Sequence, residues 1–165
     1  WVGVDLSRTI DLTAISILVE RDGKLIFLTK NFLPKSTIES ETQYPFEYWM
    51  EKGYLTQADP FTDSGCIDYD FVADEIITLC EKYDVQKIAI DRAGASHLIN
   101  RLIQDGRDVL DVPQNVTVMS DPNKTFQSMV YEKKLLHGKN PLLDWETANV
   151  RVKDINGLLK ILKEY

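Results

Sequence analysis

The sequence predicts a mixed α/β domain, a sheet of antiparallel and parallel strands with helices on both faces. Two patterns predict it: three strand-like segments open the chain, and helix-like and strand-like segments alternate after residue 69. The length of 165 residues fits one domain, and a hydrophobic content of 44% is enough for a sizeable core. We therefore expect a single domain over residues 1–165.

The first 34 residues predict a three-stranded antiparallel meander. Trp1–Leu6 is a short apolar strand, and Leu12–Val19 alternates as its antiparallel return. Asp22-Gly23 is a strong hairpin dipeptide, and Lys24–Phe32 is the third strand, which Pro34 ends. The stretch from about residue 34 to 65 is polar, acidic and aromatic, so we interpret it as an elaboration of the core with one helix, Glu41–Lys52.

The middle of the chain predicts a helix–strand–helix order. Tyr69–Tyr83 has the apolar stripe of an amphipathic helix, and Lys87–Asp91 is a compact buried strand. A second helix follows, with Leu98, Ile99 and Leu102 among its inward positions.

The C-terminal third is predicted as a strand, Asn115–Met119, and a helix that begins at Ser120-Asp121-Pro122 and runs to about Leu136. A strand near Val150–Val152 and a helix from Leu158 complete the chain. Three antiparallel strands followed by alternating helices and strands is the order of a ribonuclease H-like core.

Net charge is −7, but it is unevenly spread: residues 1–123 carry −10 and residues 124–165 carry +3. A polyanionic partner should therefore meet the C-terminal third. The candidate DNA-binding residues are Lys133, Lys134, Lys139, Arg151 and Lys153. A solvated helix face explains the pair of Lys133 and Lys134 equally well.

Cys66 and Cys80 match neither a redox pair nor a zinc site, which predicts reduced, intracellular thiols. No apolar run is long enough for a membrane span.

Two aspartates are the strongest candidates for chemistry. Alternation in the first strand places Asp5 mid-strand, opposite to Val4, where an ionised carboxylate needs a cation or a set of donors. Asp91 ends a buried strand, and sites in open α/β sheets form at such ends. If the two strands are neighbours, Mg²⁺ or Mn²⁺ would offset the repulsion between the carboxylates. Taken singly, each Asp is better explained by a structural role, a turn cap or an ion pair such as Arg92 beside Asp91, than by catalysis, and Asp5 in mid-strand is the harder of the two to explain in this way.

Three segments resemble the nuclease domain of the large terminase subunit of tailed phages, the motor that packages and cuts viral DNA. They are VGVDLSRTIDLTA from Val2, IAIDRAGA from Ile88 and LLHGKNPLLDWETANV from Leu135. The resemblance implies a ribonuclease H-like fold and an endonuclease that cuts concatemeric phage or prophage DNA with two Mg²⁺ or Mn²⁺ ions. Asp5 and Asp91 match two catalytic metal ligands of the family, and the third acid is expected beyond Tyr165.

The same resemblance implies partners and location. We expect double-stranded DNA as substrate, and a larger protein in which an N-terminal ATPase domain precedes this piece and further residues follow it. A portal, a small terminase subunit and the cytoplasm of a bacterial host are implied too, without a membrane.

Other residues are weaker candidates. Asp11 is better explained as a turn residue, and His97 as a surface or half-buried side chain with no partner within reach by sequence. His137 could meet a phosphate or carry a proton, but is better explained as the cap of a helix C-terminus. Trp49 and Trp145 are better explained as core or contact anchors than as base-stacking residues.

Two alternative functions stay open. One is an ATP-dependent phosphotransferase of the actin and sugar-kinase type. Such proteins usually have a glycine after the aspartate, whereas Leu6 and Ser7 follow here, which argues against this function. The other is a non-catalytic docking module that uses the acidic region Thr37–Asp70.

Overall fold

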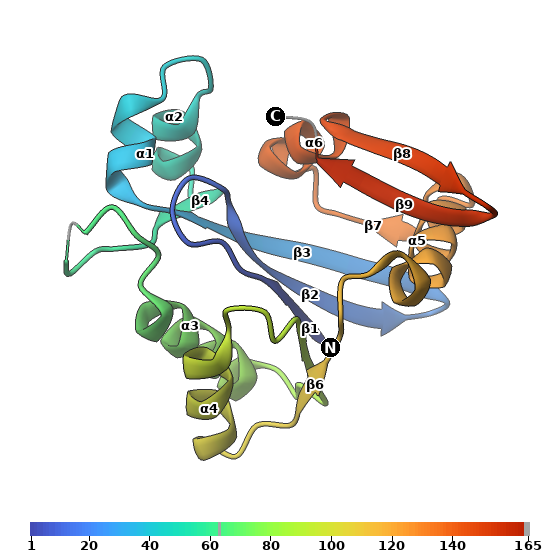
Figure 1. Ribbon diagram of the computed structural model, residues 1–165, viewed down its shortest axis with the longest axis horizontal. Coiled ribbons are helices and arrows are strands. Elements are labelled where there is room, and N and C mark those ends of the chain that lie inside the picture. The colour runs from blue at the N-terminus through green and yellow to red at the C-terminus, as the bar shows by residue number, and fades with distance from the viewer. Residues whose placement is uncertain (63, 164–165) are drawn as a thin grey trace.

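A mixed sheet forms the centre of the computed structural model, which describes residues 1–62 and 64–163 (Figure 1). Within these residues the sheet has seven strands, in the order β4-β3-β2-β1-β5-β6, with β7 paired to β3 near one end. Strands β1, β2 and β3 are antiparallel neighbours, whereas β5 pairs with β1 and β6 with β5 in parallel. The predicted mixed sheet is thus confirmed.

The predicted N-terminal meander is confirmed with small shifts in its bounds. The strands are β1 (Val2–Asp5), β2 (Thr13–Arg21) and β3 (Lys24–Leu33). Asp22 and Gly23 both have positive φ, 53° and 72°, as a two-residue turn that follows the strand twist requires.

The elaboration contains more regular structure than the single helix predicted for Glu41–Lys52. It has two short helices, α1 (Lys35–Ser40) and α2 (Phe46–Glu51), and a strand, β4 (Leu55–Gln57), parallel to β3. The helix predicted from Glu41 begins only at Phe46, because the chain turns at Pro45, directly before α2. A buried cluster attaches this part to the sheet; it contains Leu33, Ile38, Phe46, Trp49, Leu55 and Leu142.

Helices cover both faces of the sheet, as predicted. Helices α3 (Tyr69–Lys82) and α4 (Ser96–Gln104) lie on the face that carries Val4 and Ile90 and enclose the larger core. They flank β5 (Ile88–Ile90), and β6 (Val109–Asp111) follows α4. The C-terminal elements gather on the other side of the sheet in Figure 1.

The prediction for residues 115–136 was wrong in its boundaries. Asn115–Met119 is not a strand: Asn115 caps α5 (Val116–Tyr131), its Oδ1 accepting the Val118 N–H at 3.0 Å. The strand lies earlier, at β6. Pro122 lies inside the helix rather than at its first position, and Ser120 is buried, its Oγ accepting the Leu159 N–H at 3.0 Å. Packing of α5 against the end of the chain thus determines where the helix begins and overrides the capping pattern at Ser120-Asp121-Pro122.

The remaining elements are β7 (Leu135–Leu136), α6 (Pro141–Ala148) and the hairpin of β8 (Val150–Ile155) and β9 (Leu158–Lys163). The predicted strand at Val150 is confirmed, but the helix from Leu158 is a strand; residues 164–165 of that prediction lie outside the described residues. Asn156 and Gly157 have positive φ, 53° and 82°, so a second two-residue turn forms this hairpin.

Candidate metal centre

Asp5 and Asp91 lie at the same ends of two adjacent parallel strands. The register pairs Val2 with Ile88 and Val4 with Ile90, so the next position in each strand is Asp5 and Asp91. Residues that match in a parallel pair point to the same face of the sheet. The structure therefore brings the two predicted aspartates together on the face opposite to Val4. One detail differs from the prediction: Asp5 is the last residue of β1 and half-buried, not a buried residue in mid-strand.

Gln114 connects the two carboxylates. Its side-chain Nε2 donates to Asp5 Oδ1 at 3.2 Å, and its backbone N–H donates to Asp91 Oδ2 at 3.3 Å. A third donor, the Ala93 N–H, reaches Asp91 Oδ1 at 3.0 Å, so both oxygens of this carboxylate accept a backbone hydrogen bond. Local sequence patterns do not single out Gln114, because they predict no strand at β6 and place one instead at Asn115–Met119, directly after Gln114.

The neighbouring arginine does not neutralise Asp91. Arg92 Nε lies 3.1 Å from Asp111 Oδ2, at the end of the next strand. Among the described residues, the side chain of Asp91 has only backbone N–H donors as partners. The alternative explanation of Asp91 as half of an ion pair with Arg92 is therefore not supported.

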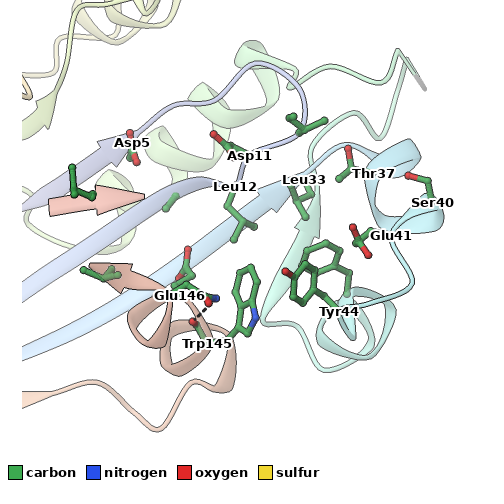
Figure 2. A pocket seen from close by; sticks show the side chains of 16 residues that line it. Asp5, Asp11, Leu12, Leu33, Thr37, Ser40, Glu41, Tyr44, Trp145 and Glu146 are labelled. Atoms are coloured by element: carbon green, nitrogen blue, oxygen red, sulfur yellow. Dashed lines mark hydrogen bonds between the residues drawn. The ribbon is translucent and has the colours of Figure 1, made fainter. Parts of the chain in front are cut away.

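A cavity of about 630 Å³ opens beside Asp5. Figure 2 shows Asp5 and Asp11 near one another along one side of the cavity, with Glu146 and Trp145 of α6 across from them. Leu12, Leu33 and Phe46 contribute apolar wall, and Val150 and Leu162 bring the hairpin to the same cavity. Asp91 and Gln114 do not line it, so the cavity adjoins the carboxylate pair rather than containing it.

The comparisons with known proteins bear on what such a pair does. The family model described as the terminase large subunit, endonuclease domain, matches residues 1–165. The chain belongs to this family. It is 28% identical to the terminase large subunit of Lactococcus phage SK1 over 93% of its length, and 29% identical to the protein YmfN of Escherichia coli K12 over 96%.

The solved structures agree. The crystal structure of the HK97 bacteriophage large terminase superposes with a TM-score of 0.86 over 98% of this chain, at 26% identity. The ribonuclease H-like fold is thereby confirmed. The chain covers 29% and 37% of the two sequence relatives and 34% of the HK97 chain, about a third of the length of each.

In this terminase endonuclease domain, the oxygen donors fit a hard divalent cation. Mg²⁺ binds through one or two carboxylates together with substrate phosphates and water, and Asp5 and Asp91 supply two carboxylates on one face. Within residues 1–62 and 64–163, no group of three His, Cys, Asp or Glu side chains gathers to hold a metal. Asp5 and Asp91 are therefore the two carboxylates that the described residues could contribute to a metal site.

The predicted basic residues lie on three segments. Lys133 and Lys134 connect α5 to β7, Lys139 follows β7, and Arg151 and Lys153 lie on β8. Strand β7 pairs with Leu25 and Ile26, at the far end of β3 from the carboxylates. Asp5 aligns with Asn31 through Ala14, and Leu25 is six positions away, about 20 Å at the usual strand rise. Strand β8 instead starts at the cavity beside Asp5.

The two histidines differ from their predicted environments. His137 follows β7 rather than a helix, with its Nδ1 3.8 Å from Asp144 Oδ1. His97 has a partner: its Nε2 lies 2.9 Å from Asp70 Oδ1, which Arg101 Nη1 also contacts at 2.9 Å. These two donors, His97 first, hold the pKa of the Asp70 carboxyl below its usual value.

The remaining predicted side chains have structural surroundings. Trp49 is buried, and Trp145 packs against it with ring centroids 5.6 Å apart, which confirms both as packing anchors. Cys66 and Cys80 are free thiols. None of the helices in the described part of the chain has the length and apolar character that a membrane crossing requires.

Proposed function

We propose that this chain is a metal-dependent endodeoxyribonuclease domain that cuts concatemeric phage or prophage DNA during genome packaging. The observation that carries the proposal is the matched position of Asp5 and Asp91 on one face of the sheet, in a chain of the terminase endonuclease family. The HK97 match supports the same reading over the phosphotransferase alternative. Asp5 and Asp91 are the proposed catalytic residues.

In this proposal, Asp5 and Asp91 bind two Mg²⁺ or Mn²⁺ ions together with a third acid beyond Tyr165. When bound, the ions would activate a water molecule and stabilise the leaving 3′ oxygen of the phosphodiester. The residues of this chain would bind the ions and fix the orientation of the carboxylates that bind them. The N–H groups of Ala93 and Gln114 fix the Asp91 carboxylate, while the Gln114 amide fixes that of Asp5. Without cations, the two carboxylates would repel a DNA phosphate.

The DNA is proposed to cross the C-terminal side of the domain. Arg151 and Lys153 lie on β8, which starts at the cavity beside Asp5. Lys133, Lys134 and Lys139 flank β7, whose partner Leu25 is about 20 Å along β3 from the row of Asp5, the length of about six base pairs at about 3.4 Å per step. A duplex that spans both groups would place a phosphodiester near the carboxylates.

The wider assembly follows from the family and is part of the proposal. The partners are double-stranded DNA, an N-terminal ATPase domain of the same chain, a portal and a small terminase subunit, in the cytoplasm of a bacterial host. The terminase large subunits of Lactococcus phages and the HK97 large terminase, about three times the length of this chain, support this expectation.

The test is DNA cleavage by the full-length protein that carries this domain, measured at millimolar Mn²⁺ or Mg²⁺ and again with the metal removed by a chelator. We expect plasmid cleavage that requires the metal, and binding of Mn²⁺ by the same protein. A protein that binds Mn²⁺ but leaves DNA uncut in all conditions would contradict the nuclease proposal, and one that neither binds Mn²⁺ nor cuts DNA would favour the docking module.

A further inference from the structure

We propose that Gln114 is a positioning residue for the metal centre, one that holds the Asp5 and Asp91 carboxylates in a common orientation. The inference rests on the proposed nuclease function. It assigns a role to a side chain outside the pair itself, in a loop that neither the motifs nor the family resemblance singled out.

The first argument is that Gln114 contacts both carboxylates from a single residue. Its side-chain amide donates to Asp5 Oδ1 at 3.2 Å, and its own backbone N–H donates to Asp91 Oδ2 at 3.3 Å. Two like charges on adjacent strands repel, and N–H donors shared between them offset part of that repulsion. Gln114 therefore keeps the pair together before a cation arrives.

The second argument is that the backbone on both sides of Gln114 is fixed. The Val112 N–H donates to the Ile90 carbonyl at 2.9 Å, which ties the loop to the end of β5. Asn115 caps α5, with its Oδ1 bonded to the Val118 N–H. Gln114 lies between these two attachments, so its amide is held near the carboxylates by β5 and by α5.

The third argument concerns which contact the side chain makes. The bond to Asp91 uses the backbone of Gln114, whereas the bond to Asp5 uses its amide, and Asp91 also has the Ala93 N–H. Substitution of the side chain therefore removes the bond to Asp5 Oδ1 and leaves the backbone bond to Asp91 Oδ2 in place. Partners that orient metal-binding carboxylates typically change metal affinity by about 10-fold to 100-fold when removed.

The experiment uses the full-length protein and Mn²⁺ alone, with free Mn²⁺ measured by electron paramagnetic resonance. Gln114→Met keeps the length of the side chain but removes the donor, and Gln104→Ala is the control at an exposed glutamine on α4. We expect the Kd for Mn²⁺ to rise about 10-fold in Gln114→Met and to stay unchanged in Gln104→Ala. The metal-free melting temperature of Gln114→Met should stay within about 2 °C of wild type.

A cleavage assay separates positioning from a structural role. In Gln114→Met, the Mn²⁺ concentration for half-maximal cleavage should rise about 10-fold, while the maximal rate at saturating Mn²⁺ stays within about 3-fold of wild type. An unchanged Kd would overturn the inference, and so would a loss of metal affinity that comes with a drop in melting temperature of more than about 5 °C.

The same measurements distinguish this inference from the proposed function. Metal-dependent cleavage by wild type together with an unchanged Kd in Gln114→Met would overturn the role of Gln114 and leave the nuclease intact. Mn²⁺ binding that weakens in Gln114→Met, without cleavage by wild type, would support the positioning role and overturn the nuclease. A wild-type protein that binds no Mn²⁺ would overturn both.

Discussion

Asp5 and Asp91 continue the parallel register of β1 and β5 by one position beyond Val4 and Ile90. This relationship places two acids on one face at the carboxyl ends of adjacent strands, and Gln114 bonds to both.

Asp5→Asn and Asp91→Asn should each abolish metal-dependent DNA cleavage by the full-length protein. Each substitution removes a negative charge from the pair without changing the shape of the side chain, so the melting temperature should stay equal or rise slightly. The measurements are plasmid cleavage and thermal unfolding of the same preparations. Wild-type cleavage rates in either variant would show that the aspartate has been given the wrong role.

The fold and the position of the pair could be predicted because their signals are local. Asp22-Gly23 determines the first hairpin, and alternation in β1 and β5 places Asp5 and Asp91 on matching faces. Gln114 could not be found in this way. Its role depends on β6 ending beside Asp91, whereas the β-branched residues that follow Asn115 favour a strand by local pattern although they begin α5.

The C-terminal hairpin has a turn signal in its sequence that competes with the helix expected from Leu158. Asn156-Gly157 is as strong a turn dipeptide as Asp22-Gly23, and it joins two strands where a helix was expected. The apolar run from Leu158 is compatible with either structure by periodicity alone. The bond from the Leu159 N–H to Ser120 is a long-range contact that no local pattern contains.

Asn31→Leu should stabilise the domain. Asn31 is fully buried on β3, in the same row as Asp5, and neither atom of its amide has a hydrogen-bond partner among the described residues. A buried polar group without a partner costs about 1–3 kcal/mol, and leucine keeps the branched shape of asparagine at Cγ, although its methyl groups are larger than the amide atoms they replace. We expect thermal unfolding to shift upward by several °C. Asn100→Leu, on the exposed face of α4, is the control and should gain nothing; a lower melting temperature for Asn31→Leu would contradict the prediction.

Asp70→Asn should reduce stability in a pH-dependent way. His97 and Arg101 lower the pKa of Asp70 in the folded chain, so its charge stabilises the fold above the unfolded pKa of about 3.9. This contribution is lost as the pH falls through the lowered folded value. The group is exposed, so the difference in melting temperature at pH 6 should not exceed about 3 °C, and it should vanish once the pH lies below the lowered pKa of Asp70 in the folded chain. Asp84→Asn, on the surface after α3, is the control; a constant difference at all pH values would indicate a cause other than this charge.

The basic residues around β7 should contribute to DNA affinity through counterion release. The isolated domain has a net charge of −7, so its DNA binding should be weak and fall steeply with salt, and local lysines decide the slope. Lys133→Glu/Lys134→Glu should weaken binding and flatten the dependence of log K on log salt by about two contacts, although Lys134 already pairs with Glu132. The control pair is Glu47→Lys/Glu51→Lys, on α2 of the acidic elaboration, which should change neither quantity strongly because neither residue lines the cavity beside Asp5. Fluorescence anisotropy of a labelled duplex across a salt titration measures both. If the lysine pair leaves affinity and slope unchanged while the glutamate pair alters them, DNA approaches across the elaboration instead.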